Sequence, residues 1–306
     1  MKEKFFRKFM DMPLDEAASA ALRAGREHGS LRFEACAIVN AKSGRCCEDC
    51  KFCAQSAFHS TGISEYPLKT PEEIFAEALR AKENGASRFG IVTSGNRLTR
   101  KELAEISIAI KRISGTLGLR VCASLGALSA EELDGLKASG LSRYHHNIES
   151  SPSYYPKIVS THTFQERLST IKTAKAAGLE VCSGGIIGLG ETWEDRLDMA
   201  MTLDGLNVDA VPLNFLIPVK GTLMEGAPSI GKEDALRTIS LFRLVMPARD
   251  IKIIAGRETV FREDQERIFR AGANGIMVGG YLTTGGQSFE EDMVLSEAAR
   301  SIWTMG

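Results

Sequence analysis

Residues 119–150 read LRVCASLGALSAEELDGLKASGLSRYHHNIES and contain one complete copy of the pattern that decides the fold. Two strand-like runs, 119–124 and 143–149, enclose a helix-like segment at 129–139. That segment begins at a serine, a favoured helix N-cap, and is followed by a glycine, which is common after a helix C-terminus. The stretch therefore predicts a strand–helix–strand unit whose two strands run parallel.

The same alternation extends over most of the chain and predicts eight strands, each followed by a helix. Strands are expected near 33–39, 88–93, 119–124, 143–149, 179–187, 208–217, 250–255 and 274–278. Helices are expected at 71–84, 100–114, 129–139, 164–177, 191–204, 232–246, 260–271 and 289–302. Eight such units favour a single α/β domain, a (β/α)8 TIM barrel, with a doubly wound open sheet as the alternative.

The N-terminal segment lies outside this repeat. Residues 13–29 are rich in alanine and predict a helix closed by Gly29. We therefore expect an N-terminal helical extension over residues 1–31 and the barrel over residues 32–306. Several barrel helices have a hydroxyl residue at their expected start, namely Thr70, Thr99, Ser129, Thr163 and Thr259.

The composition of the 306 residues excludes several classes of protein. Lysine and arginine number 38 against 39 acidic residues, so the formal net charge is -1, and we expect neither a nucleic-acid partner nor an anionic membrane. No apolar run reaches the ~18–20 residues that a membrane span needs. The basic N-terminus is not followed by the apolar region of a signal peptide, so we expect a cytoplasmic protein.

The expected strands carry polar residues at alternate positions, which is unusual for a parallel barrel. These residues are Glu34, Cys36, Asn40, Arg120, Cys122, Ser124, His145, Asn147, Glu149, Glu180, Cys182, Asn214 and Lys252. Residues two apart in a strand share a face, so these side chains are expected to point into the barrel. Burying them is costly unless they bind something, which predicts a ligand chamber; a solvated antiparallel face is the alternative.

Cysteine is the most informative residue type in the chain. There are seven, an odd number that argues against a disulfide framework. Three of them form the motif Cys46-x-x-x-Cys50-x-x-Cys53. Three thiolates without a nearby fourth can hold three irons of a [4Fe–4S] cluster and leave the fourth iron open for another ligand. A zinc site or an ordinary iron–sulfur site is the alternative.

The segment CCEDCKFCAQS resembles the CxxxCxφC motif of the radical S-adenosylmethionine (SAM) superfamily. Further stretches in the same order resemble the biotin synthase family, including VCASLGALSAEEL, YHHNIESSPSYYPKIVSTHTFQERL, VCSGGIIGLGETWEDR, VPLNFLIPVKGT and AGRE. The resemblance runs over residues 32–284 and implies a (β/α)8 barrel. It also implies cleavage of SAM to a 5′-deoxyadenosyl radical, hydrogen abstraction from dethiobiotin and insertion of sulfur to form biotin.

The resemblance also implies roles for individual residues. Cys46, Cys50 and Cys53 would hold the [4Fe–4S] cluster that binds SAM. The implied SAM contacts are Phe52, Asn147, Glu149, Arg167, Gly185 and Ile187. The implied dethiobiotin contacts are Asn147, Asn214, Thr283 and Thr284, with Asn147 and Asn214 as the candidate catalytic residues. The glycine segment, residues 185–191 (GIIGLGE), resembles the family's SAM-supporting segment, with a tight strand-to-helix turn as the alternative. For Asn214 the alternative is a strand-end residue bound to backbone.

The chain departs from the family at the second, auxiliary iron–sulfur cluster, which is the usual sulfur source. The family's [2Fe–2S] cluster is held by cysteines on strands two, three and five and by an arginine on strand seven. Cys122 and Cys182 match two of these ligands. The strand-two segment, residues 87–91, reads SRFGI without a cysteine, and Lys252 stands at the arginine position.

A different set of cysteines offers a replacement. Inward side chains of alternate strands form one layer of a barrel, so Cys36, Cys122 and Cys182 are predicted to converge, with Lys252 completing the layer. We expect a 4Fe-type auxiliary cluster rather than [2Fe–2S], with an open iron that could carry sulfide. A protonated Lys252 could donate hydrogen bonds to that sulfide. Cys47 is either a further ligand or a small loop residue.

Two other functions are considered beside sulfur insertion. One is different chemistry in another radical SAM barrel, such as a hydrogenase maturase. The other is a non-catalytic iron–sulfur electron carrier, which would not cleave SAM and has no need of a chamber. The family resemblance further implies a flavodoxin or ferredoxin as reductant and a homodimer.

Overall fold

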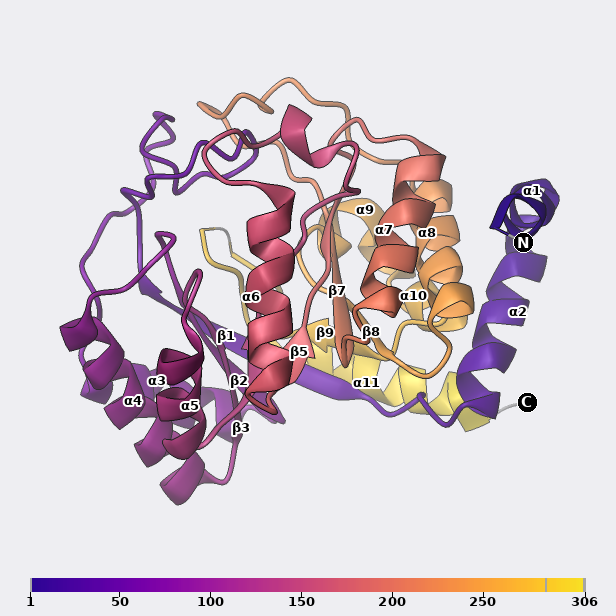
Figure 1. Ribbon diagram of the computed structural model, residues 1–306. Helices are drawn as coiled ribbons and strands as arrows, with labels where there is room; N and C mark the ends of the chain where they lie inside the picture. Colours follow the sequence, from indigo (N-terminus) through magenta and orange to yellow (C-terminus); the bar gives the residue numbers. More distant parts are fainter. Residues whose placement is uncertain (1, 284, 305–306) are drawn as a thin grey trace.

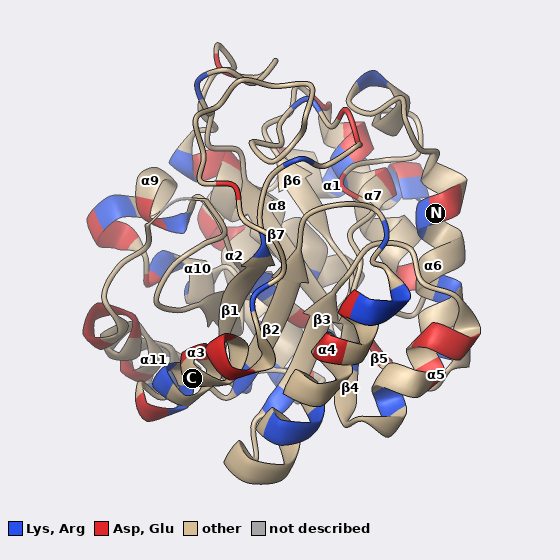
Figure 2. Ribbon diagram, turned by 90° about the vertical axis from the view of Figure 1, so that its left-hand side faces the viewer, with Lys and Arg blue, Asp and Glu red and all other residues tan. Residues whose placement is uncertain are grey.

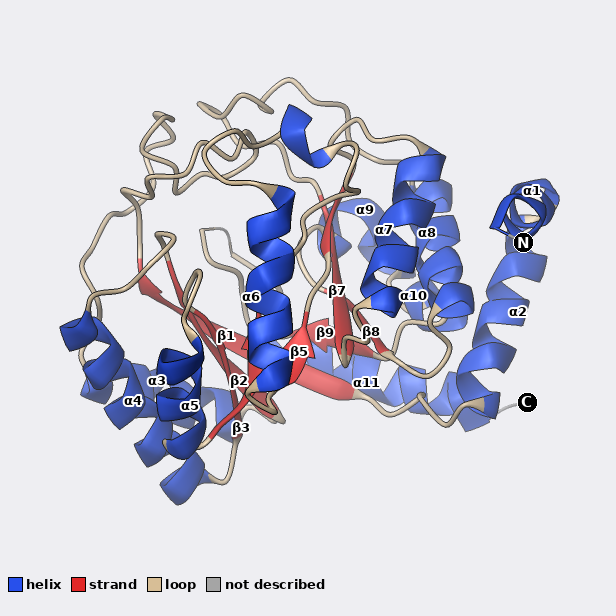
Figure 3. Cartoon of the chain, in the orientation of Figure 1, coloured by secondary structure: helices blue, strands red, loops and turns tan. Residues whose placement is uncertain are grey.

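The computed structural model describes residues 2–283 and 285–304, and their strands form one closed parallel barrel with the helices outside it (Figure 1, Figure 3). The predicted (β/α)8 fold is therefore confirmed. The strands are β1 (Glu34–Lys42), β2 (Arg88–Thr93), β3 (Arg120–Ser124), β4 (Leu141–His145), β5 (Glu180–Cys182), β6 (Gly185–Ile187), β7 (Ala210–Phe215), β8 (Asp250–Ile253) and β9 (Gly275–Met277).

The fifth barrel strand is divided into β5 and β6, and both parts pair with β7. β5 lies beside β4 and meets β7 where Cys182 pairs with Ala210, and this pairing closes the ring and excludes the open sheet. Gly184 lies at the break. A Cβ atom there would stand 1.9 Å from the carbonyl oxygen of Pro212, so the two strands can approach this closely only where that residue has no side chain.

β4 ends at His145, earlier than the predicted end at residue 149. Glu149 has a φ of 63°, which is left-handed and cannot belong to an extended strand. The chain rejoins the sheet through an isolated pairing of Glu149 with Gly185. The side chains of Asn147 and Glu149 therefore lie at the carboxyl end of the barrel, beyond its regular wall.

Most predicted helices occur within two residues of their expected bounds. They are α3 (Pro71–Glu83), α4 (Arg100–Arg112), α5 (Ala130–Ala138), α6 (Phe164–Ala176), α7 (Trp193–Gly205), α8 (Lys232–Val245) and α11 (Phe289–Thr304). In a capping box, a hydroxyl and an acidic side chain three residues later each accept the other residue's main-chain N–H. Such boxes confirm four predicted helix starts and add Thr192; their first residues are Thr70, Thr99, Ser129, Thr163 and Thr192.

The helix predicted at 260–271 is wrong, because the chain breaks there into short pieces. Arg262 has a left-handed φ of 49°, which interrupts the helix. The predicted start at Thr259 is also wrong, since Thr259 lies inside the first piece and Gly256 holds the N-cap position. The pieces are α9 (Arg257–Phe261), a 3-10 turn (Arg262–Asp264) and α10 (Arg267–Arg270).

Two N-terminal helices, α1 (Lys2–Asp11) and α2 (Leu14–Glu27), pack on the outer helices of the barrel (Figure 1). Phe9 of α1 is buried in a small apolar cluster with Leu197 of α7 and Leu241 of α8. α2 lies beside α8 and confirms the predicted N-terminal helix. The extension is therefore held to the barrel by apolar burial.

Basic and acidic residues are interspersed over the outer helices, as expected from the small net charge (Figure 2). In the part of the chain that the structure describes, no helix is both long and apolar enough to cross a lipid bilayer.

Replacing Ser129 with alanine should lower the free energy of unfolding by about 1 kcal/mol, because the N–H of Glu132 loses its acceptor at the start of α5. Urea unfolding followed by circular dichroism measures this change. Ser139→Ala is the matched control at the other end of α5, where the hydroxyl only adds a bond to the Gly135 carbonyl, and it should change the free energy by less than about 0.5 kcal/mol. Equal effects of the two substitutions would contradict the capping role.

Candidate functional site

A cavity of about 400 Å³ lies inside the barrel and extends to the loops at the carboxyl ends of the strands. Its lining includes the polar side chains Cys36, Cys122, Ser124, His145, Asn147, Glu149, Cys182, Asn214 and Lys252. The prediction that alternating polar residues face a chamber is therefore confirmed for these positions. The solvated antiparallel face is wrong, because every strand pairing in the barrel is parallel.

The three-cysteine motif lies at the mouth of this chamber, in the loop between β1 and α3. Cys53 and the adjoining Phe52 line the cavity. Cys50 is buried and Cys46 is partly buried, and all three cysteines are free thiols. Burial raises the pKa of each thiol, and each lies close enough to another for its charge to add to that effect. The three thiols therefore lie in one loop at the edge of the cavity, near enough for their charges to affect one another.

Main-chain N–H groups lie near two of these sulfurs. Burial has the larger effect on both thiols, but the N–H groups of Glu48 and Gly95 act to lower the pKa of Cys46, and those of two following residues act to lower that of Cys53. Donors near the sulfurs are typical of iron–sulfur clusters, where they offset the charge of the sulfurs. Three free thiols with such donors fit a [4Fe–4S] cluster with one open iron. Among the described residues, no three His, Cys, Asp or Glu side chains converge closely enough to bind a single metal ion.

A second loop, which precedes α6, fixes the shape of the cysteine loop. The Asp49 carboxylate accepts the main-chain N–H groups of Ser160 (2.8 Å) and Thr161 (3.2 Å). The N–H of Lys51 donates to the carbonyl oxygen of Ile158 at 3.0 Å. Burial opposes ionisation of Asp49, but the hydrogen bonds from Ser160 and Thr161 outweigh it and hold its pKa below the usual range. The two loops thus form one unit around the motif.

Arg167, on the first turn of α6, is held from three sides. Its Nε donates to the Tyr155 hydroxyl at 3.0 Å, and its Nη1 donates to the carbonyl oxygen of Asn147 at 3.3 Å. Its Nη2 lies 2.7 Å from Nε2 of His162. Burial opposes the charge of Arg167, but the nearby Glu149 carboxylate outweighs it and raises the Arg167 pKa. The guanidinium is therefore charged and oriented.

Asn147 and Glu149 lie beside Arg167, so the structure brings these three predicted SAM residues together. The Nδ2 of Asn147 donates to the Glu149 carboxylate at 3.3 Å, and its Oδ1 accepts the N–H of Gly184 at 3.1 Å. Burial raises the pKa of Glu149, while Arg167 acts in the opposite direction. The cluster presents amide, carboxylate and guanidinium groups at one rim of the chamber.

The glycine segment contributes mainly through its backbone. A Cβ at Gly185 would lie 2.3 Å from the carbonyl oxygen of Glu149, so the missing side chain serves the close approach of β6 to that residue. Ile187 is fully buried in the apolar core between barrel and helices. Its neighbour Ile186, which the sequence analysis did not select, lines the chamber instead.

The predicted substrate residues occupy different parts of the cavity. Asn214 lines it, and its amide is also bonded to backbone: Nδ2 donates to the Gly185 carbonyl (3.1 Å) and Oδ1 accepts the N–H of Ala255 (3.2 Å). Asn214 is thus bound to backbone near the end of β7, as in the alternative, and still faces the cavity. Thr283 lies at the rim. Thr284 lies outside the described residues.

The base of the chamber carries the second group of cysteines. Cys36, Cys122 and Cys182 all line it, together with Lys252, whose Nζ lies 3.4 Å from the Cys36 sulfur. Burial raises the pKa of Cys36 to about 12 and that of Cys182 to about 12, and it also raises that of Cys122. Cys47 is exposed, lies at the other end of the barrel and is not part of the lining.

Gly90 lies in the strand-two segment, residues 87–91, in which the family resemblance implies a cysteine. It lines the chamber and pairs in register with Ile38 on one side and Cys122 on the other. A Cβ at Gly90 would lie 3.0 Å from the Cγ2 atom of Ile38, so a side chain there would require Ile38 to move. The absent side chain leaves room beside the cysteines of the other strands.

Below the cysteines, a network of ion pairs closes the base of the barrel. Glu34 is buried, and its carboxylate contacts Lys252 and accepts from Arg88 (3.1 Å) and Arg143 (2.9 Å). Glu180, which is partly exposed, accepts from the same two arginines at 2.9 and 2.8 Å. Burial acts to lower the pKa of Lys252, whereas contact with the Glu34 carboxylate favours its ammonium form.

Sequence analysis missed Arg88 and Arg143 as members of this site. Arg143 has the same strand parity as His145, which was assigned to the inner face. Arg88 stands two residues before Gly90 on β2 and so has the same parity as that chamber residue. Extending the period-two pattern to the first residue of each predicted strand, 88–93 and 143–149, would have found both arginines.

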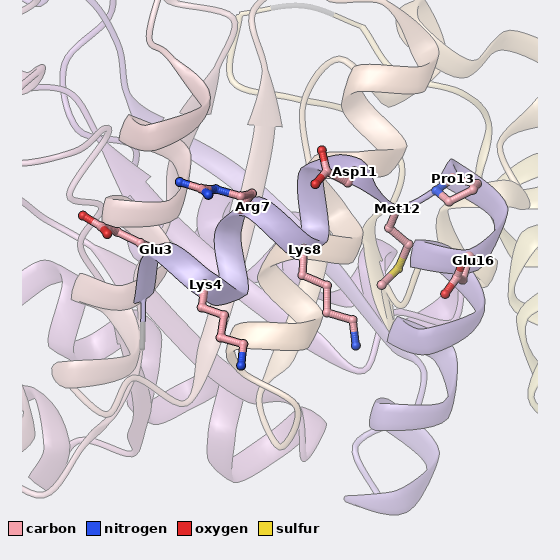
Figure 4. A pocket seen from close by; sticks show the side chains of 8 residues that line it. All are labelled: Glu3, Lys4, Arg7, Lys8, Asp11, Met12, Pro13 and Glu16. Atoms are coloured by element: carbon pink, nitrogen blue, oxygen red, sulfur yellow. The ribbon is translucent and has the colours of Figure 1, made fainter.

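A second hollow, of about 630 Å³, lies on the outer surface at the turn between α1 and α2 (Figure 4). Its lining side chains, mostly charged, come from α1, the turn and the start of α2. It contains none of the cysteines or other predicted site residues, and the chemistry therefore belongs to the barrel chamber.

Comparisons with known proteins agree with this arrangement. The Radical SAM superfamily model matches residues 41–203, and the Biotin and Thiamin Synthesis associated domain matches residues 212–299. The biotin synthase of Thermotoga petrophila is 49% identical over 288 residues, covering 94% of this chain and 96% of that protein. That of Thermotoga neapolitana is 51% identical over 272 residues, covering 89% and 97%.

Solved structures share the fold at low sequence identity. Methylornithine synthase (PylB) superposes with a TM-score of 0.76 at 21% identity, covering 89% of this chain and 80% of that one. The FeFe-hydrogenase maturase HydG from Carboxydothermus hydrogenoformans gives 0.77 at 18% identity, covering 97% and 77%. These likenesses support the barrel architecture alone.

Glu34→Gln should lower the free energy of unfolding of the iron-free protein by about 3 kcal/mol, because it leaves buried Arg88, Arg143 and Lys252 short of a counter-charge. Urea unfolding measures the change. Glu65→Gln is the control, since Glu65 pairs with the exposed Arg45 and should contribute less than about 1 kcal/mol. A Glu34→Gln protein as stable as the control would show that Glu34 does not balance this charge.

Proposed function

We infer that the chain, which belongs to the biotin synthase family of the radical SAM superfamily, is a sulfurtransferase that inserts sulfur into dethiobiotin to form biotin. One observation carries the inference beyond family membership. A single cavity is lined by Cys53 of the three-cysteine motif at its mouth and by Cys36, Cys122 and Cys182 at its base. A substrate held between them would be within reach of both groups of thiols.

At the mouth, Cys46, Cys50 and Cys53 would hold a [4Fe–4S] cluster, and SAM would bind its open iron. When bound, this pair supplies a carbon-centred radical that removes hydrogen from unactivated carbon. The chain itself holds the thiols in place through the bonds of Asp49 and shields Cys50 from water by burial.

For SAM we propose contacts from Phe52 near the adenine, Asn147 and Glu149 at the ribose and Arg167 at the carboxylate. Arg167 and Glu149 carry opposite charges at adjacent positions, which suits a ligand with a carboxylate and hydroxyl groups. Gly185 and Ile187 enter this site through the backbone of β6, because glycine has no side chain and the Ile187 side chain lies in the core.

Dethiobiotin would bind in the middle of the chamber. Asn147 and Asn214 both line it, and each uses part of its hydrogen-bonding capacity on neighbouring groups. An amide has two N–H donors and two lone pairs, so Asn214 retains one of each for the ureido group of the substrate. Thr283 and Thr284 are proposed for the substrate carboxylate at the rim.

At the base we propose a 4Fe-type auxiliary cluster on Cys36, Cys122 and Cys182, with Lys252 donating toward a sulfide. The contact between Lys252 and Cys36 and the space beside Gly90 support this ligand set. Cys47 is left out, because its thiol is exposed at the other end of the barrel.

The hydrogenase-maturase alternative is less well supported. HydG is only 18% identical to the chain, whereas the two biotin synthases are 49% and 51% identical to it. The electron-carrier alternative leaves the chamber without a use. A flavodoxin or ferredoxin reductant, a homodimer and a cytoplasmic location complete the proposal by family likeness.

Anaerobic turnover tests the function. The reconstituted protein with SAM, dithionite or a flavodoxin system and dethiobiotin should release methionine and 5′-deoxyadenosine and form biotin, measured by mass spectrometry. Asn214→Ala should leave SAM cleavage without substrate unchanged but reduce biotin formation about 10-fold or more, because a buried ureido contact is lost. SAM cleavage without any biotin from the unmodified protein would favour another radical SAM reaction, and no cleavage would favour an electron carrier.

Iron counting tests the auxiliary cluster. Anaerobic reconstitution should give about eight irons per chain, corresponding to two 4Fe clusters. Cys36→Ala should lower the count, while Cys47→Ala, the matched control, should not. A count of about six would indicate [2Fe–2S], and about four would mean that the auxiliary cluster is absent.

A further inference from the structure

We propose that His162 is a positioning residue that links the cysteine loop to Arg167 and thereby sets the affinity for SAM. The inference rests on the proposed function, in which Arg167 receives the SAM carboxylate. The sequence analysis did not select His162, which lies on the loop before α6, five residues from Arg167.

The imidazole of His162 lies between two charged side chains. Its Nδ1 is 2.9 Å from a carboxylate oxygen of Glu48, which belongs to the cysteine loop. Its Nε2 is 2.7 Å from Nη2 of Arg167. The residue is buried, and its ring packs edge-on against Tyr155 with 6.0 Å between centroids. The ring therefore has a fixed place and a fixed partner on each side.

The identity of the two partners determines the tautomer. A guanidinium can only donate hydrogen bonds, so Nε2 of His162 must accept from Arg167. The single proton of the neutral ring then lies on Nδ1 and is donated to Glu48. An imidazolium would present a second donor to Arg167 and lose that bond. Burial and the charge of Arg167 both lower the pKa of His162, in opposition to Glu48, which is consistent with the neutral form.

The same connection continues to the cluster ligand. The main-chain N–H of Glu48 lies near the Cys46 sulfur and acts to lower the pKa of that thiol, against the larger effect of burial. The Glu48 carboxylate also accepts from the hydroxyl of Thr161, which lies next to His162. Side-chain contacts thus run from Glu48 of the cysteine loop through His162 to Arg167.

The consequence for Arg167 follows from its number of donors. A guanidinium has five N–H groups. In the described part of the chain, Tyr155, Asn147 and His162 engage three of them, which leaves two for a carboxylate ligand. His162 is the partner that fixes Nη2. Without the His162 ring, the Nη2 group of Arg167 loses its acceptor, and the free N–H donors of the guanidinium lose their fixed direction.

His162→Phe removes both hydrogen bonds and retains a ring against Tyr155. In the anaerobically reconstituted full-length enzyme, it should raise the dissociation constant for SAM about 10-fold, measured by equilibrium dialysis, because Arg167 loses a charge-assisted bond. The KM for SAM should rise in parallel, with kcat at saturating SAM and the iron content preserved. His162→Gln, which offers one acceptor and one donor, should restore most of the affinity.

His146→Phe is the matched control. His146 is also buried and stacks on a tyrosine, Tyr144, at 6.5 Å, and within the described residues its ring makes no hydrogen bond. This variant should bind SAM like the unmodified enzyme. If the unmodified enzyme fails to bind SAM, the proposed function is wrong. If the unmodified enzyme binds SAM and His162→Phe binds it equally well, the role of His162 is refuted. The role is also refuted if His162→Phe and His146→Phe lose the same amount of affinity.

The tautomer provides a readout that is independent of activity and of SAM. In the oxidised full-length protein labelled with ¹⁵N-histidine, the resonances missing from His162→Phe identify His162. They should show the proton on Nδ1 at neutral pH. A proton on Nε2, or on both nitrogens, would overturn the proposed geometry.

Discussion

The balance of charge at the base of the barrel is the constraint on which the rest of the chamber depends. Glu34 is the buried carboxylate that Lys252, Arg88 and Arg143 share. A charge in such a place is tolerated only when it is paired and hydrogen-bonded, so β1, β2, β4 and β8 have to meet around one residue. The described members of this network include more cations than carboxylates. Arg88, Arg143 and Lys252 line the chamber together with the thiols, which favours an anionic ligand at that point.

The mouth of the chamber is stabilised in a different way. There the cysteine loop has no regular secondary structure, and its shape comes from main-chain groups that bind Asp49 and the loop before α6. The two ends of the chamber are therefore held together by different interactions. The base is built from strands joined by ion pairs, whereas the mouth is built from two loops that constrain each other. The middle, where a substrate would lie, is lined by amides with unused hydrogen-bonding capacity.

The fold could be predicted almost completely from the sequence, because turns, caps and strand periodicity are local properties. The exceptions are also instructive. Arg262 and Glu149 adopt left-handed conformations that no local pattern indicates, and they break one helix and shorten one strand. The cysteines of both groups could be predicted from spacing and parity. The bridging place of His162 could not, because its two partners come from other positions in the chain and meet it only in the folded barrel.

The contact between Gly90 and Ile38 has a consequence for how this ligand set relates to that of other family members. A cysteine Cβ at position 90 would lie 3.0 Å from the Cγ2 atom of Ile38 across the strand pair, so that side chain would have to shift slightly. The two arrangements of cysteines are therefore separated by a coupled change on adjacent strands. A side chain at position 38 that yields more easily than isoleucine would relieve this contact. Variation at positions 38 and 90 should be correlated during descent, and position 38 would record which ligand set a lineage has inherited.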